Sequence, residues 1–131
     1  MKIFVAIRQP RHDLTAGTLT NCITSVIQSL GHMAFIAYSE IIQRNLTPRQ
    51  FMPYVRHEIS TSDLVIVVYS ANLRGGLIEL GIAYALDIPI WLAVPAGEYV
   101  SSSALACAAQ VVEYATEQDL EAKLHHLIAG E

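Results

Sequence analysis

The sequence predicts a parallel α/β sheet with helices on both faces, and three observations support this fold class. Short apolar runs alternate with segments of helical spacing along the whole chain. The clearest unit lies between Asp63 and Val94, where an apolar run, a glycine turn, a helix and a second apolar run follow one another. Hydrophobic residues make up 53% and charged residues only 15% of the sequence, which suits a sheet buried on both sides. The 131 residues are enough for one domain, 1–131.

The first third of the chain is expected to form two strands separated by a helix. Lys2 to Ile7 is an apolar run that ends in a polar loop, as a buried strand does. Apolar residues from Leu19 to Leu30 recur at helical spacing, and a glycine then ends that helix. Met33 to Tyr38 is the second predicted strand. The segment from Ser39 to Leu46 carries no clear pattern.

The middle of the chain carries two helices and two further strands. Thr47 is an N-cap followed by Pro48 at the first helical position, which predicts a helix to about Ser62. The apolar run from Leu64 to Tyr69 is the third strand. A helix from Gly76 to Leu86 follows the glycine pair, and Ile88 to Val94 is the fourth strand.

The last third is predicted to end in a short strand and an amphipathic helix. Ser103 to Ala109 has the length of one or two helical turns, and Val111 to Tyr114 is the fifth strand. Thr116 begins the final helix, because acidic residues follow it directly and basic ones lie near the end. Five strands alternating with helices predict a three-layer, doubly wound sheet with the flavodoxin-like order 2-1-3-4-5.

That strand order predicts one crevice at the carboxyl edge of the sheet. Strands one and three become neighbours, so the loops that follow them, Arg8 to Asp13 and Ser70 to Gly76, are expected to face each other. Arg8, Arg11 and Arg74 would converge there, and a guanidinium is suited to bidentate contact with a phosphate. The alternative is that Arg11 and Arg74 are solvated loop residues. His12 and Asp13 are a weaker candidate for an acid-base pair.

Glu79 is the strongest candidate for chemistry. It is expected in the first turn of its helix, where the helix dipole would keep the carboxylate ionised, ready to attack or stabilise an electrophilic sugar carbon. The alternative is an ordinary acidic residue that stabilises the helix start. Gly75 and Gly76 favour the first interpretation, because a backbone without side chains lets a ligand approach closely. Tyr84, one turn further on, is expected in the core.

Charge, hydropathy and cysteine content exclude several classes of protein. A net charge of −4 and a pI near 5.7 speak against binding of a nucleic-acid polymer. The sequence shows no apolar segment of the ~20 residues needed to cross a membrane and no signal peptide, so we expect a cytoplasmic protein. Cys22 and Cys107 are expected to be buried free thiols. Metal-ligating patterns are absent from the sequence, and neither a metal nor a cofactor is expected.

Three segments together resemble the nucleoside 2-deoxyribosyltransferase superfamily. Gly75 to Leu86 reads GGLIELGIAYAL and, with Ile88 to Ile90, is similar to the superfamily signature G-x-x-x-E-L-G-x-A-x-A-x-x-x-x-P-[IV]. Ala6 to Asp13 is similar to the S-I-R-G-G-R-x-D loop of the 2'-deoxynucleoside 5'-monophosphate N-glycosidase branch. Ser103 to Leu105 is similar to a serine-bearing segment that reaches the phosphate in a neighbouring subunit.

The resemblance implies a flavodoxin-like fold and assembly into a homodimer or larger homo-oligomer. It implies a protein that cleaves the N-glycosidic bond of a nucleoside or nucleoside monophosphate, or transfers the sugar to another base, without a metal or cofactor. It implies that Glu79 is the nucleophile and that Arg8 holds the phosphate. It also implies that the Gly75 and Gly76 backbone forms the wall beside the sugar, and that Ser103 is donated to the site of the partner subunit.

Three positions depart from the pattern that the resemblance implies. Ala6 and Leu73 stand where serines would contact the phosphate. Val55 stands where most members carry an aspartate that holds the sugar, and Glu58 is the nearest carboxylate, one helical turn further on. These departures favour the alternative of a non-catalytic nucleotide-binding or sensor module with the same fold.

Overall fold

A five-stranded parallel sheet forms the centre of the protein. The structure is a computed structural model that describes residues 1–10 and 14–131. The strands are β1 (Lys2–Ala6), β2 (Met33–Ile36), β3 (Leu64–Val68), β4 (Ile90–Pro95) and β5 (Gln110–Tyr114), in the order β2-β1-β3-β4-β5. Every neighbouring pair is parallel, with Ile3 of β1 opposite Leu64 of β3. The predicted fold class and strand order are confirmed.

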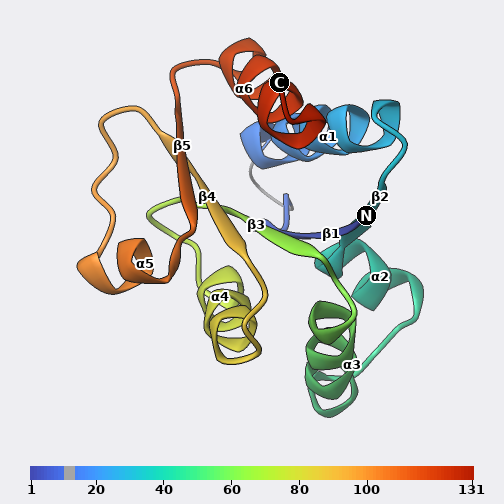
Figure 1. Ribbon diagram of the computed structural model, residues 1–131. Helices are drawn as coiled ribbons and strands as arrows, with labels where there is room; N and C mark the ends of the chain where they lie inside the picture. Colours follow the sequence, from blue (N-terminus) through green and yellow to red (C-terminus); the bar gives the residue numbers. More distant parts are fainter. Residues whose placement is uncertain (11–13) are drawn as a thin grey trace.

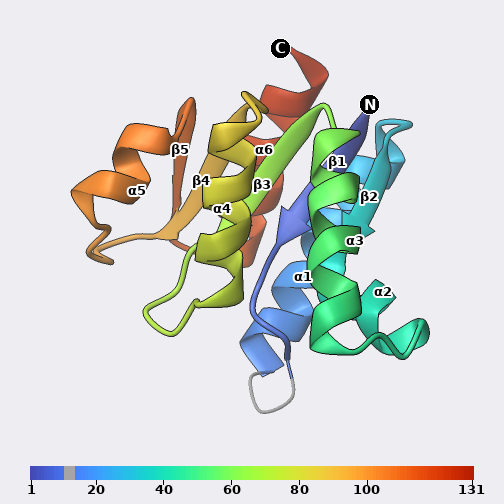
Figure 2. The ribbon, with the colours of Figure 1, turned by 90° about the horizontal axis from the view of Figure 1, so that it is seen from below.

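Helices cover both faces of the sheet and complete three layers (Figure 1). Six helices are described: α1 (Leu14–Ser29), α2 (Ala37–Gln43), α3 (Pro48–Ser60), α4 (Gly75–Ala85), α5 (Ser102–Cys107) and α6 (Glu117–Ala129). Helices α1 and α6 pack on one face, and α2 to α5 lie on the other (Figure 2). Each connection between strands therefore passes over one face of the sheet, as parallel pairing requires.

The alternation of side chains along the central strands separates two hydrophobic cores. In β1, Ile3 and Val5 point to the core beneath α1 and α6, whereas Phe4 and Ala6 point to the core beneath α2 to α5. All five residues of β3 are buried. Because both faces of these strands are covered, their sequences are continuous apolar runs instead of alternating ones.

The second strand is shorter than predicted, because a helix begins where the strand was expected to continue. Strand β2 ends at Ile36, and α2 occupies Ala37–Gln43. Ala37 and Ile41 are four residues apart, so helical spacing directs both toward the core on that face of the sheet. Glu40 and Arg44 form an ion pair at 3.3 Å, also at helical spacing. The segment without a clear pattern is therefore mostly helical.

The start of the chain is anchored to the end of α3. The ammonium group of Lys2 pairs with Glu58, both side chains being about four-fifths buried, and donates a hydrogen bond to Thr61 Oγ1 at 2.7 Å. The backbone N–H of Lys2 donates to Asp63 Oδ2 at 2.8 Å. Strand β1 is thus held at its first residue.

The two cysteines are free but only half-buried, so the prediction that both are buried was wrong. Cys22 lies near the middle of α1, and its Sγ is 3.7 Å from the carbonyl oxygen of Glu117, the first residue of α6. Partial burial and the neighbouring carboxylates raise the pKa of the Cys22 thiol. Cys107 is the last residue of α5.

Candidate active site

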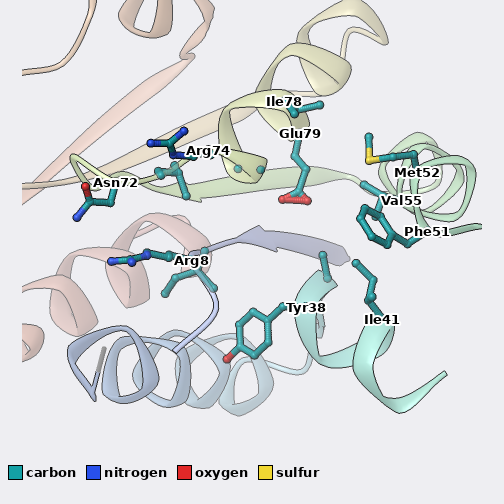
Figure 3. A pocket seen from close by; sticks show the side chains of 15 residues that line it. Arg8, Tyr38, Ile41, Phe51, Met52, Val55, Asn72, Arg74, Ile78 and Glu79 are labelled. Atoms are coloured by element: carbon teal, nitrogen blue, oxygen red, sulfur yellow. The ribbon is translucent and has the colours of Figure 1, made fainter. Parts of the chain in front are cut away.

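A cavity of about 700 Å³ opens where β1 ends and α4 begins. Ile7 and Arg8 line it after β1, and residues 72–76 line it on the loop that follows β3. Helices α2 and α3 close the remaining side (Figure 3). The predicted crevice between the two loops is confirmed for the described residues, whereas Arg11, His12 and Asp13 lie outside them. The volume is within the range of small-molecule sites, roughly 300–1,000 Å³.

Glu79 directs its carboxyl group into the middle of this cavity (Figure 3). It is the fifth residue of α4, because the helix begins at Gly75, one residue earlier than predicted. The prediction that Glu79 lies in the first turn and is kept ionised there was wrong. The helix dipole acts mainly within the first turn, and burial then dominates, raising the pKa of Glu79 to about 8.

The glycine pair serves two different purposes at the start of α4. Gly76 is buried, and a Cβ placed on it would lie 2.6 Å from Leu73 Cδ1, so a side chain there would collide with the preceding loop. Gly75 has open space where a Cβ would be, and both glycines line the cavity. A side chain at position 76 would thus force the buried Leu73 side chain to shift, which favours glycine there, and both glycines border the cavity.

The two ends of the cavity differ in polarity. Arg8, Asn72 and Arg74 occupy one end, and Glu79 lies between them and the opposite end (Figure 3). Arg8 and Arg74 come from the loops after β1 and β3, as predicted from the strand order. Gly75 and Gly76, the first two residues of α4, line the same cavity, and the amide groups at the very start of a helix have no partner within it. This end is suited to an anion.

The opposite end is apolar and was missed by the sequence analysis, except for Val55. It is lined by Ile41 of α2 and by Phe51, Met52 and Val55 of α3. Phe51 and Val55 are four residues apart, so their spacing already placed them on one face of the predicted helix. Tyr38 also lines the cavity, and its hydroxyl lies 3.3 Å from Thr20 Oγ1.

The structure shows where the three departures from the superfamily pattern lie. Val55 lines the cavity and is only 2% exposed, whereas Glu58 is paired with Lys2 and is not among the lining residues. Glu58 therefore does not replace a carboxylate at position 55. Ala6 and Leu73 are buried in the core on the α4 side of the sheet.

Ser103 is separate from this cavity in the chain described here. It is exposed on α5 and is not among the residues that line the cavity of its own chain. The neighbouring Ser101 is the cap of that helix, where its Oγ accepts a hydrogen bond from the N–H of Ala104 at 3.3 Å. A contribution of Ser103 to a partner subunit remains a prediction.

The described residues include neither a helix that could span a membrane nor a cluster of metal-ligating side chains. None of the helices in 1–10 and 14–131 is both long enough and apolar enough to span a bilayer. Within the same residues, no three His, Cys, Asp or Glu side chains gather closely enough to hold a metal ion.

Comparison with known proteins adds structural neighbours. No protein-family model and no curated protein matches the chain. The CMP N-glycosidase BcmB of Clostridium botulinum is similar in structure, with a TM-score of 0.74, 17% identity, and coverage of 95% of this chain and 98% of BcmB.

Two further solved structures match over most of their length. The 2-deoxyribosyltransferase of Bacillus psychrosaccharolyticus has a TM-score of 0.67 and 20% identity, covering 92% of this chain and 90% of that one. BlsM has a TM-score of 0.70 and 19% identity, with coverage of 98% and 90%. The chain therefore shares its overall fold, a three-layer parallel α/β sheet, with these three solved structures, as the resemblance in its sequence predicted.

Proposed function

We propose that this protein cleaves or transfers at the N-glycosidic bond of a nucleoside or nucleoside 5'-monophosphate, with Glu79 as nucleophile. One observation supports this most directly: the Glu79 carboxyl group projects into a cavity that has two arginines at one end and apolar side chains at the other. A nucleotide has the same sequence of chemical groups, with an anion, a sugar carbon and a planar base. The shared fold with an N-glycosidase and a deoxyribosyltransferase is consistent with it.

The chemistry would proceed through two displacements at the anomeric carbon. Ionised Glu79 attacks that carbon and forms an ester, while the bond to the base nitrogen breaks and the base leaves with the electron pair. The departing base takes a proton from water. In hydrolysis, a second water attacks the same carbon, releasing the sugar and regenerating the carboxylate. In transfer, a second base takes the place of this water.

A monophosphate fits the polar end better than a free nucleoside does. Arg8 and Arg74 carry the positive charge of the described lining residues, and the start of α4 adds amide groups. In this assignment the phosphate lies between the two loops and the backbone of Gly75 and Gly76 borders the sugar. The net negative charge of the chain argues against a nucleic-acid polymer as substrate.

The exposed face of α4 and α5 supports assembly into a homodimer or larger homo-oligomer. Four large apolar side chains on these two helices are exposed: Leu77 (39% exposed), Ile78 (56%), Tyr84 (58%) and Leu105 (43%), of which Ile78 also lines the cavity. Tyr84 was expected in the core, and its exposure corrects that prediction. A partner covering this face would bury apolar area, and Ser103 on α5 is close enough in sequence to be carried into the interface. Free cysteines agree with a cytoplasmic location.

The test measures, by chromatography, the release of free base from nucleosides and from 2'-deoxynucleoside 5'-monophosphates. The wild-type protein should release base, and Glu79→Gln should abolish release, because the amide has no negative charge with which to attack carbon. The control is Glu98→Gln, which changes an exposed glutamate in the β4–α5 loop and should keep full activity. Wild-type release no greater than that of Glu79→Gln would refute the proposed chemistry.

The second candidate function is a nucleotide-binding module without turnover. It is favoured by the apolar residues at three positions where the superfamily pattern has polar ones, Ala6, Val55 and Leu73, all of which are buried. A thermal-shift measurement separates the candidates, because a ligand present at 100 times its Kd stabilises the fold by about 2.7 kcal/mol whether or not it is consumed. Stabilisation by nucleotides without base release would support this second function.

A further inference from the structure

Glu79 is the one carboxylic acid among the described residues that line the cavity. Arg8 and Arg74 keep their protons, because a guanidinium is not deprotonated in proteins. Tyr38 donates its hydroxyl proton to Thr20 Oγ1 at 3.3 Å, and Figure 3 shows this hydroxyl turned away from Glu79. Among the described lining residues, the proposed nucleophile is therefore the one side chain suited to donate a proton to a leaving group, and it cannot serve both purposes in one step.

The space on the side of Glu79 away from the arginines disfavours a new charge. It is lined by four apolar side chains: Ile41, Phe51, Met52 and Val55. Apolar surroundings penalise a group that becomes charged, and burial has this effect on Glu79 itself, raising its pKa to about 8. A neutral base that leaves without gaining a proton becomes an anion. This end of the cavity therefore opposes the departure of an ordinary base.

We propose that the preferred substrates are nucleotides whose base carries a permanent positive charge, such as an N-alkylated purine or a pyridinium ring. The inference rests on the proposed function and specifies its substrate class. A cationic base leaves as a neutral molecule, so its departure needs no proton. The side chains that line the cavity are then sufficient for the reaction.

The first displacement removes two charges at once. An oxygen of ionised Glu79 forms a bond to the anomeric carbon, while the carbon–nitrogen bond breaks and its electron pair returns to the ring of the base. The products are a neutral ester and a neutral base. Water then attacks the same carbon, restores the carboxylate and releases the sugar phosphate and one proton to the solvent. Burial favours the first displacement, because charges that are costly in apolar surroundings diminish on the way to the transition state.

A cationic base also helps to ionise the nucleophile. The attacking oxygen and the base lie on opposite sides of one carbon atom, so the two charges are about 5 Å apart when the substrate is bound. An opposite charge at this distance lowers the pKa of a carboxylic acid, which counteracts the effect of burial on Glu79. The ring of Phe51, on the same side of the cavity, adds a face that attracts cations.

Three nucleotides provide the test. Guanosine 5'-monophosphate and its 7-methyl derivative differ by one methyl group and one positive charge, and nicotinamide mononucleotide carries a cationic base of a different shape. Base release by the wild-type protein is measured for each and corrected for release without protein. We expect kcat to be at least about 100-fold higher for both cationic nucleotides, since general acid catalysis typically contributes about 10²- to 10⁴-fold. Glu79→Gln should abolish the release.

A carboxyl group added to the cavity should reduce this preference. Val55→Asp would supply a proton donor, which helps only the neutral substrate, and should narrow the ratio of the kcat values to about tenfold or less. Val55→Asn is the matched control, because its amide has the same size without an acidic proton, and it should keep the wild-type ratio. Val55 is only 2% exposed, so Met52→Glu and Met52→Gln provide the same comparison at a half-buried position if the first pair does not fold.

The outcomes separate the inference from the proposed function. Wild-type kcat values within about tenfold of one another would overturn the inference and leave the proposed function standing, because another group would then supply the proton. A preference that no folded acidic variant narrows would also overturn the inference. If neither kind of nucleotide releases base, the proposed function fails and the inference fails with it. Release from the cationic nucleotides that greatly exceeds release from guanosine 5'-monophosphate, and that Glu79→Gln abolishes, would support both.

Discussion

The burial of Glu79 should make the stability of the protein fall as the pH rises. Its pKa is about 8 in the folded protein, against an ordinary value of 4.5. Below pH 4.5 the group is neutral in both states. Between 4.5 and about 8 the unfolded chain releases the proton while the folded protein keeps it, so the free energy of unfolding decreases. The loss is complete above pH 8.

The magnitude follows from the difference between the two pKa values. At 1.36 kcal/mol for each pKa unit, the change from 4.5 to about 8 corresponds to at most about 5 kcal/mol. The carboxyl group is partly accessible through the cavity, and solvent screening reduces the effect. We therefore expect about 2 to 3 kcal/mol. Glu79→Gln removes the titrating group. The free energy of unfolding of the variant minus that of the wild type should therefore be about 2 to 3 kcal/mol larger at pH 9 than at pH 4.5.

Urea unfolding at pH 4.5 and pH 9 measures this difference. Taking the variant minus the wild type at each pH cancels the titration of all other groups. Glu98→Gln, on an exposed loop, should change the free energy of unfolding by no more than about 0.5 kcal/mol at either pH. If the gap between Glu79→Gln and the wild type does not widen from pH 4.5 to pH 9, the carboxyl group is ionised in the folded protein at neutral pH and the argument from burial fails.

Three further predictions concern the rate of base release and the ends of two helices. If Glu79 is the nucleophile, kcat/KM for base release should rise about tenfold per pH unit below pH 8 and level off above it, since the carboxylate must be ionised; a profile already flat at pH 6 would contradict this. Gly76→Ala should lower the free energy of unfolding by about 1 to 3 kcal/mol, because the new methyl group would collide with the Leu73 side chain. Gly75→Ala, which has open space around the new methyl group, should be neutral or stabilising by up to about 1 kcal/mol. Equal effects of the two substitutions in chemical denaturation would contradict the packing argument. Thr116→Ala should lower the free energy of unfolding by about 1 kcal/mol in the same assay, because the Thr116 hydroxyl caps α6 by accepting a hydrogen bond from the N–H of Asp119 at 3.1 Å. Thr116→Ser keeps a hydroxyl at this position and should retain the wild-type stability.

The strands and most helices could be predicted from the sequence because their physical signals are local. A short, continuous apolar run such as Leu64–Val68, which is buried on both faces, is typical of a central strand of a parallel sheet. The short helix α2 was not predicted, since its seven residues make only about two turns and a pair of apolar positions such as Ala37 and Ile41 is a weak signal over so short a segment. That pair becomes meaningful only when the sheet is present to cover it.

The candidate site was predicted only in part, for a similar reason. The strand order alone brought Arg8, Arg74 and the glycine pair to one cavity. The protonation state of Glu79 depends on how much protein surrounds it, which no local pattern encodes. Phe51 belongs to the site because α3 packs beside α4, a contact between segments far apart along the chain.

The anchor at Lys2 has a consequence for the opposite end of β1. A strand advances about 3.3 Å per residue, so the ion pair with Glu58 sets how far Arg8 reaches beyond the sheet. Inserting one residue between them would displace the guanidinium or detach the lysine, and it would also exchange the side chains that face the two cores along the rest of the strand. The number of residues from Lys2 to Arg8 thus sets the position of the guanidinium at which an anion would bind.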